Sequence, residues 1–121
     1  MKDRVKLYDY GFSIVQIETK ATCNMACRFC PHPLRQDKKS VLPTDVVYKL
    51  LDQIDPNKGA FEYVCFSHFN EPLMDLRLFD FIRYAKHKGL PTFIITNALL
   101  LRKEDIMQKM IDSSPKMIKI S

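Results

Sequence analysis

The chain has 121 residues, 46% of them hydrophobic and 27% charged, and its formal net charge is +5. This length suffices for one domain with a modest core, and the composition is that of a globular protein. No apolar run approaches the roughly 20 residues that cross a bilayer, and residues 1–5 lack the apolar stretch of a signal peptide. We therefore expect a cytoplasmic protein without membrane contact. The basic residues are scattered along the chain, which argues against nucleic acid as a partner.

Strands and helices are expected to alternate along the chain. Runs of β-branched and aromatic residues predict strands over 12–18, 61–68, 92–96 and 117–120. Apolar residues at helical spacing predict helices over 44–54, between Asp75 and Gly89, and over 103–112. We expect Asp75 to cap the second helix and Gly89 to end it in the left-handed conformation. The third helix is expected to bury Ile106, Met110 and Ile111.

This alternation, in units of about 30 residues, is typical of an α/β fold in which helices connect parallel strands. The functional groups of such sheets gather at the carboxyl ends of the strands. A conspicuous polar feature follows each predicted strand: a cysteine-rich loop after the first, then Glu71, Asn97 and Ser121. The sequence therefore predicts a functional site at that edge of the sheet, built by about three and a half β-α units.

Three cysteines, Cys23, Cys27 and Cys30, lie at C-x3-C-x2-C spacing in a long loop over 19–43, called here the cysteine loop. Thiolates this close in sequence suit an iron-sulfur cluster or zinc. The nearest fourth ligand for a structural zinc module is His32. An iron-sulfur electron carrier would instead need Cys65, which lies within a predicted strand and is expected to be a core residue. The spacing alone leaves these alternatives open.

The cysteine motif, with Phe29 between its second and third cysteine, resembles the C-x3-C-x-aromatic-C signature of the radical S-adenosylmethionine (SAM) superfamily. Two further stretches are similar to that superfamily. Residues 69–73 look like its Gly-Gly-Glu-Pro stretch, with Phe69 and Asn70 where glycines are usual. Residues 96–98 resemble its Thr-Asn-Gly stretch, with alanine in place of the glycine.

The resemblance implies the N-terminal portion of a partial (β/α)6 TIM-like barrel. It also implies that Cys23, Cys27 and Cys30 hold a 4Fe-4S cluster whose open iron binds the amino and carboxylate groups of SAM. The cofactor-binding residues by resemblance are Glu71, at the amino group; Phe29, beside the adenine or packed on the barrel rim; and Asn97 and Ser121. The implied enzyme is an oxidoreductase or transferase that cleaves SAM reductively to a 5′-deoxyadenosyl radical, which abstracts hydrogen from an unidentified substrate.

The resemblance implies an electron donor such as flavodoxin or ferredoxin. Residues 23–33 and 70–75 look most like members that carry a C-terminal cluster (SPASM) domain and modify peptides or proteins. Because a six-unit barrel needs roughly 180 residues, we expect residues 1–121 to be the N-terminal part of the radical SAM core domain. We expect this part alone to be inactive.

Overall fold

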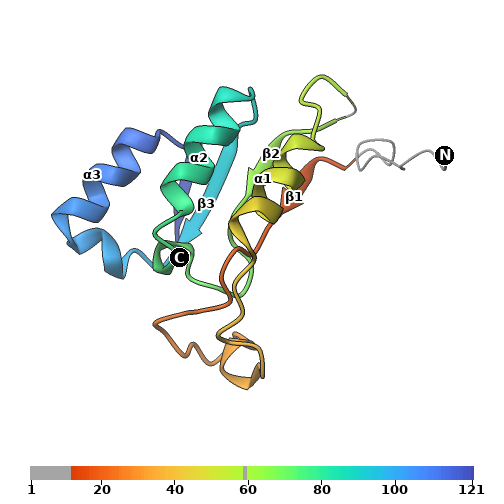
Figure 1. Ribbon diagram of the computed structural model, residues 1–121. Coiled ribbons are helices and arrows are strands. Elements are labelled where there is room, and N and C mark those ends of the chain that lie inside the picture. Colours follow the sequence, from red (N-terminus) through yellow and green to blue (C-terminus); the bar gives the residue numbers. More distant parts are fainter. Residues whose placement is uncertain (1–11, 59) are drawn as a thin grey trace.

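The computed structural model describes residues 12–58 and 60–121. Within them, four parallel strands form one sheet in the order β1-β2-β3-β4. Three α-helices and three short 3₁₀ helices connect the strands (Figure 1). In chain order the elements are β1 (Ile14–Gln16), η2 (His32–Leu34), α1 (Thr44–Asp52), β2 (Tyr63–Cys65), η3 (Pro72–Met74), α2 (Leu78–His87), β3 (Thr92–Thr96), η4 (Leu99–Arg102), α3 (Glu104–Ser113) and β4 (Met117–Ile120).

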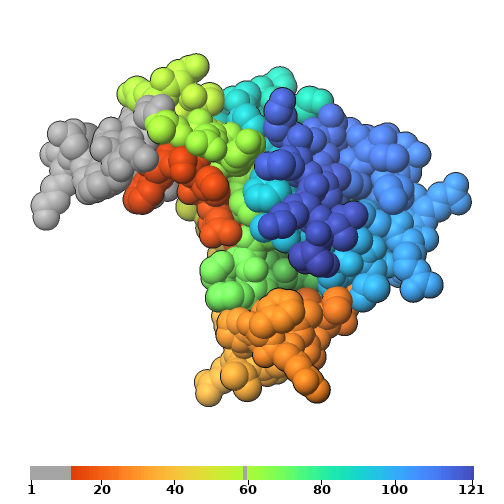
Figure 2. Space-filling view, turned by 180° about the vertical axis from the view of Figure 1, so that it is seen from behind, coloured from red at the N-terminus to blue at the C-terminus, as the bar shows by residue number. Residues whose placement is uncertain are grey.

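The helices α1, α2 and α3 lie on one face of the sheet (Figure 1). This follows from the topology, because crossovers between adjacent parallel strands share one hand. Figure 2, seen from behind, shows the strands on the opposite face uncovered and the cysteine loop, in orange, projecting below the body. The predicted α/β fold with parallel strands is confirmed.

The hydrophobic core lies between the helices and the sheet. Val64 of β2 and Ile94 of β3 are fully buried, because alternate strand residues point toward the helices. From the helices, Leu51, Phe81 and Ile82 meet them as part of one buried cluster. Burial of each such side chain contributes roughly 1.5–3 kcal/mol, so this layer holds the strand ends in place.

The predicted bounds of β3 and β4 agree with the structure, whereas β1 and β2 are shorter than the predicted 12–18 and 61–68. Pairing continues just past the ends of β1, because Ile17 N–H donates to Cys65 O (2.8 Å) and Glu62 N–H donates to Ser13 O (2.7 Å). Beyond Ile17 the chain leaves the sheet to form the base of the cysteine loop.

Gly89 ends the second helix with φ of +75°, as predicted. Two other expectations were wrong. Asp75 is not the N-cap residue of α2, because the helix begins at Leu78 and Arg77 occupies the N-cap position. Ile111 is 61% exposed, because it lies one residue, or about 100°, around α3 from the buried Met110.

Candidate functional site

A cavity of about 470 Å³ lies at the carboxyl ends of the strands. Its walls come from the cysteine loop after β1, the segment after β2, the end of β3 and the residue after β4. All seven predicted site residues line it: Cys23, Cys27, Phe29, Cys30, Glu71, Asn97 and Ser121. Other lining residues that the sequence had not singled out include Met25, Ser67 and Ile95. Ser67 and Ile95 lie near the ends of predicted strands, and that position could have marked them as residues of the site.

The base of the cysteine loop is closed by backbone pairing. Ala21 N–H donates to Ser40 O (2.8 Å) and Leu42 N–H donates to Thr19 O (2.9 Å). His32 is buried under the loop, where its Nε2 lies 3.0 Å from Ala21 O. Since Ala21 O can only accept, Nε2 carries the proton in this contact. These contacts shape the loop so that its thiols border the cavity.

Arg77 joins both ends of the cysteine loop to the start of α2. Its guanidinium donates to Leu42 O (2.9 Å) and to Thr19 O (3.3 Å). The same group forms two bonds to the Asp75 carboxylate, at 2.9 and 2.7 Å. Asp75 also accepts a hydrogen bond from the Thr19 hydroxyl (2.8 Å). We call Thr19, Asp75 and Arg77 the loop clamp.

The Asp75 side chain is 4% exposed, and the pKa of its carboxyl reflects two opposing effects. Burial would raise the pKa, but the hydrogen bonds from Arg77 and Thr19 outweigh it and hold the pKa below its ordinary value. Asp75 is therefore an anion at neutral pH. Its charge stabilises the loop clamp.

The three thiols of the cysteine loop are partly exposed and free. Within residues 12–58 and 60–121, no three His, Cys, Asp or Glu side chains are arranged to hold a single metal ion. His32, the nearest fourth ligand for a structural zinc module, does not line the cavity. A cubane cluster takes each thiolate on a different iron, so its ligands need not meet at one point.

Cys65 is 1% exposed and lies outside the cavity, as expected for a core residue. Its thiol donates to Ser67 O (3.6 Å), so the structure gives no support to Cys65 as a fourth cluster ligand. The pKa of Cys23 is raised, chiefly by burial. A hydrogen bond from the Met25 backbone lowers the pKa of Cys23, and its acidic neighbours Glu71, Cys30 and Cys27 raise it further. A bound cation would reverse this balance and favour the thiolate.

Glu71 is 3% exposed, and its carboxylate organises the cavity floor. Oε1 accepts from Leu73 N–H (3.1 Å) and from the Thr96 hydroxyl (2.6 Å). Oε2 accepts from Asn97 N–H (2.9 Å). A carboxylate has about four acceptor sites, so one remains, on Oε2, for a donor from the cavity.

Asn97 connects the end of β3 to the cysteine loop. Its Nδ2 donates to Asn24 Oδ1 (2.8 Å), while its Oδ1 accepts from Leu99 N–H (3.1 Å). Ala98 follows in the left-handed conformation, with φ of 63°. Glycine would adopt this conformation without strain, which explains the glycine of the Thr-Asn-Gly stretch that residues 96–98 resemble.

An apolar wall stands opposite these polar groups. Phe29 is 92% exposed, so its ring is not packed on the rim and is free to contact a ligand. Met25 and Phe69, also exposed, line the same cavity. Ser121 completes the wall next to β3, where its N–H donates to Thr96 O (3.0 Å). The cavity thus presents an apolar surface, a carboxylate and three thiols to whatever binds in it.

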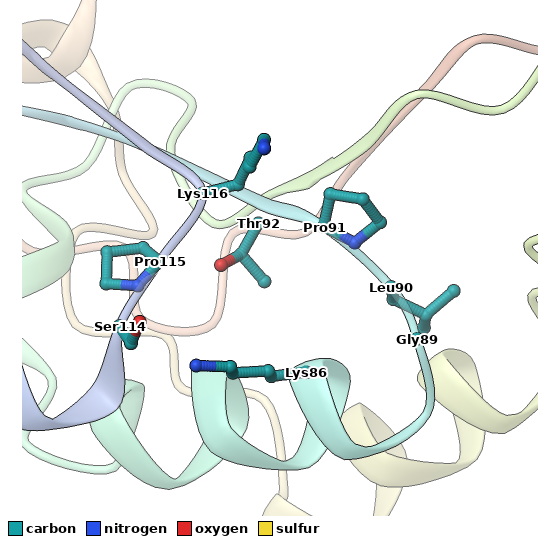
Figure 3. Close-up of a pocket in the computed structure, with 8 residues that line it drawn as sticks. All are labelled: Lys86, Gly89, Leu90, Pro91, Thr92, Ser114, Pro115 and Lys116. Atoms are coloured by element: carbon teal, nitrogen blue, oxygen red, sulfur yellow. The ribbon is translucent and has the colours of Figure 1, made fainter.

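A second cavity, of about 380 Å³, lies at the opposite end of the strands (Figure 3). Lys86 and Lys116 border it, together with Ser114 and Pro115. The helices α2 and α3 end here, and the carbonyl groups at helix ends favour cations. The lysines therefore complement the helix ends and are remote from the thiols.

No helix within the described ranges, 12–58 and 60–121, is both long and apolar enough to cross a membrane.

A cavity with three thiols at the carboxyl edge of a parallel sheet defines a cofactor-binding α/β enzyme site. The family model described as the radical SAM superfamily matches residues 17–121, and the chain belongs to this superfamily. Its members use a 4Fe-4S cluster and SAM.

Two solved structures of BtrN are similar to this chain. The structure of BtrN in complex with AdoMet and 2-DOIA has a TM-score of 0.76 at 20% identity, over 90% of this chain and 45% of that one. BtrN in an open conformation has a TM-score of 0.74 at 21% identity, over 90% of this chain and 49% of that one. These values show a shared fold, which agrees with the predicted partial TIM-like barrel. The chain spans about half the length of these structures.

Proposed function

We propose that this chain forms the cluster-binding and SAM-binding part of a radical SAM enzyme. The observation that carries the proposal is the convergence of Cys23, Cys27 and Cys30 with Glu71 on one cavity. The three thiols supply the soft ligands that iron requires. The cavity also has open space beside them for a ligand on the remaining iron.

Each proposed cofactor-binding residue has a role that its contacts support. Glu71 has one free acceptor site on Oε2 for the amino group of SAM. Phe29 presents an exposed ring to the adenine. Asn97 and Ser121 line the wall at the ends of β3 and β4, within reach of the ribose or carboxylate. A 4Fe-4S cluster held by Cys23, Cys27 and Cys30 would, when bound, supply the electron for the reductive cleavage of SAM.

The electron donor is proposed to be a flavodoxin or ferredoxin. The net charge of +5 supports an acidic partner of this kind, and Arg28 lies exposed between two of the cysteines. Free thiols at the site support a reducing, cytoplasmic location. A peptide or protein substrate remains a prediction from the similarity of residues 23–33 and 70–75 to members that modify them.

Iron and sulfide analysis tests the cluster assignment. Protein reconstituted anaerobically is expected to be brown and to hold about four irons. Replacing Cys23, Cys27 or Cys30 by alanine is expected to remove most of the iron. Cys65→Ala is the matched control, because Cys65 is a buried thiol outside the cavity, and it should retain the iron. If Cys65→Ala loses as much iron as the other variants, the three-thiol assignment is wrong.

Turnover coupled to substrate is proposed to need more chain than these residues. The solved structures that this chain matches are about twice its length, since it covers 45% and 49% of them. Residues 1–121 and a longer chain of the same superfamily are each supplied with SAM and reductant. The 5′-deoxyadenosine that each forms is then measured. Equal turnover by both would refute this part of the proposal.

A further inference from the structure

The turn after the third cysteine brings a single backbone donor to its sulfur. Residues 31–33 read Pro-His-Pro, and because proline has no N–H, His32 carries the only backbone donor of the three. This N–H donates to Cys30 Sγ at 3.5 Å, a distance normal for a sulfur acceptor because sulfur is larger than oxygen. The turn itself is η2, closed by Leu34 N–H on Pro31 O (3.0 Å). The Cys30 sulfur therefore has a hydrogen-bond donor in addition to any metal that it holds.

The imidazole of His32 anchors this turn to the base of the cysteine loop. The side chain is buried, and its Nε2–H donates to Ala21 O (3.0 Å), 11 positions earlier in the chain. Ala21 is itself fixed, because its N–H donates to Ser40 O (2.8 Å). The rings of Pro31 and Pro33 restrict φ, so little freedom remains between the anchored imidazole and the backbone N–H of His32. The contact with Ala21 therefore sets where that N–H points.

We propose that His32 is a positioning residue that raises the reduction potential of a 4Fe-4S cluster held by Cys30. This inference rests on the proposed function, because it takes Cys30 as a cluster ligand. An N–H aimed at a ligand sulfur offsets part of its negative charge, and hydrogen bonds to the sulfurs are among the determinants of cluster potential. The reduced cluster carries one electron more than the oxidised one, so it gains more from the donor. Loss of the donor consequently makes the cluster harder to reduce.

Other roles for His32 fit its surroundings less well. Its ring does not line the cavity, so it does not contact a substrate or cofactor bound there. Its Nε2 carries the proton donated to Ala21 O, which leaves that nitrogen without a lone pair for a metal. A purely structural role would alter the stability of the loop but not the potential of a cluster that is still bound. The potential is therefore the property that separates positioning from support.

Two amides of different length test the contact with Ala21. Glutamine brings an NH₂ group close to the place of Nε2, whereas the shorter asparagine does not reach Ala21 O. The 4Fe-4S proteins carrying His32→Gln and His32→Asn are titrated with dithionite, and the EPR signal of the reduced cluster gives the ratio of reduced to oxidised cluster at each potential.

The expected result is read at the potential that half-reduces the wild-type cluster. There the ratio of reduced to oxidised cluster should be about three- to tenfold lower in His32→Asn, the effect of one hydrogen bond. This corresponds to about 30–60 mV for a one-electron couple, at about 59 mV per tenfold. His32→Gln keeps the donor and should stay within about twofold of wild type.

A third variant and a control complete the comparison. His32→Phe keeps the volume of the ring without a donor and should give the same lowered ratio as His32→Asn. Leu34→Ala is the matched control, because Leu34 lies in the same turn and is 86% exposed, and it should leave the ratio unchanged.

Each other outcome contradicts a different part of the inference. A wild-type ratio in His32→Asn and His32→Phe would overturn the positioning role while leaving the proposed function intact. An equal shift in His32→Gln and His32→Asn would overturn the contact with Ala21 as its cause. Loss of iron from all three variants would overturn the inference by showing that His32 only supports the loop. Failure of the wild-type protein to hold about four irons would overturn the proposed function itself.

Discussion

Replacing Arg77 by alanine is expected to loosen the cysteine loop and destabilise the fold. The guanidinium donates to carbonyls at both ends of that loop, at Leu42 and Thr19. It also pairs with Asp75, whose side chain is 4% exposed. The Arg77→Ala variant therefore removes two ties on the loop and leaves a buried carboxylate without its cation.

The magnitude follows from the contacts. Removing one partner of a buried ion pair costs about 3–5 kcal/mol. Because 28% of the Arg77 side chain is exposed, water reaches Asp75 after truncation, which places the effect at the lower end. We expect the free energy of unfolding to fall by about 3 kcal/mol, a large part of the roughly 5–15 kcal/mol that stabilises a domain. The melting temperature should fall by about 10 °C.

The assay is urea denaturation of the cluster-free protein, followed by circular dichroism. Arg83→Ala is the matched control, because Arg83 lies on the same helix and pairs with Asp80 at the exposed surface. Such pairs contribute about 1 kcal/mol or less. Arg77→Lys keeps the charge without the planar fork and should fall between the two. Equal stability of the Arg77→Ala and Arg83→Ala variants would refute the loop clamp.

Three further predictions concern the same region. Glu71→Ala should lower the free energy of unfolding by about 2–4 kcal/mol, because it leaves buried donors unpaired. Thr96→Val removes one of those donors and should lower the free energy of unfolding by less. Urea denaturation of the two variants measures the difference. Ala98→Gly should leave the free energy of unfolding unchanged or raise it by up to about 1 kcal/mol, because relief of the left-handed strain offsets the flexibility of glycine. A clear fall in melting temperature would contradict this expectation. The pKa of Asp75 is lower in the folded state than its ordinary 3.8. Its contribution to stability is therefore present above pH 3.8 and is lost as pH falls through the folded pKa. The free energy of unfolding, measured at decreasing pH, should fall less steeply in Asp75→Asn than in wild type.

The order of elements could be predicted from the sequence because it depends on local patterns. A run of β-branched and aromatic residues marked β3, and Gly89 marked the end of α2. The gathering of the seven site residues followed from topology, since parallel strands bring their carboxyl ends to one edge. The burial of Cys65 followed from its place within an apolar run.

The polar contacts could not be predicted in the same way, because they join residues far apart in the chain. Thr19 and Asp75 are 56 positions apart, and Asn24 and Asn97 are 73 apart. No local spacing encodes such pairs. Glu71 was singled out as a ligand, but its three bonds to neighbouring groups were invisible in the sequence. The same limit applied to Asp75, whose position suggested a cap and whose bond from the distant Thr19 hydroxyl was equally invisible.

The loop clamp has a consequence for the order in which the chain is made. Leu42 precedes Arg77 by 35 positions, so the cysteine loop leaves the ribosome before the residue that ties its ends together. At roughly 5–20 residues per second, this interval lasts about 2–7 s. During that time the cysteine loop lacks its contacts with Arg77, and its three thiols are open to oxidation or to unselective metals. Protein synthesised in air should therefore lose cluster-binding capacity before folding is complete, and synthesis under reducing, anaerobic conditions should preserve it.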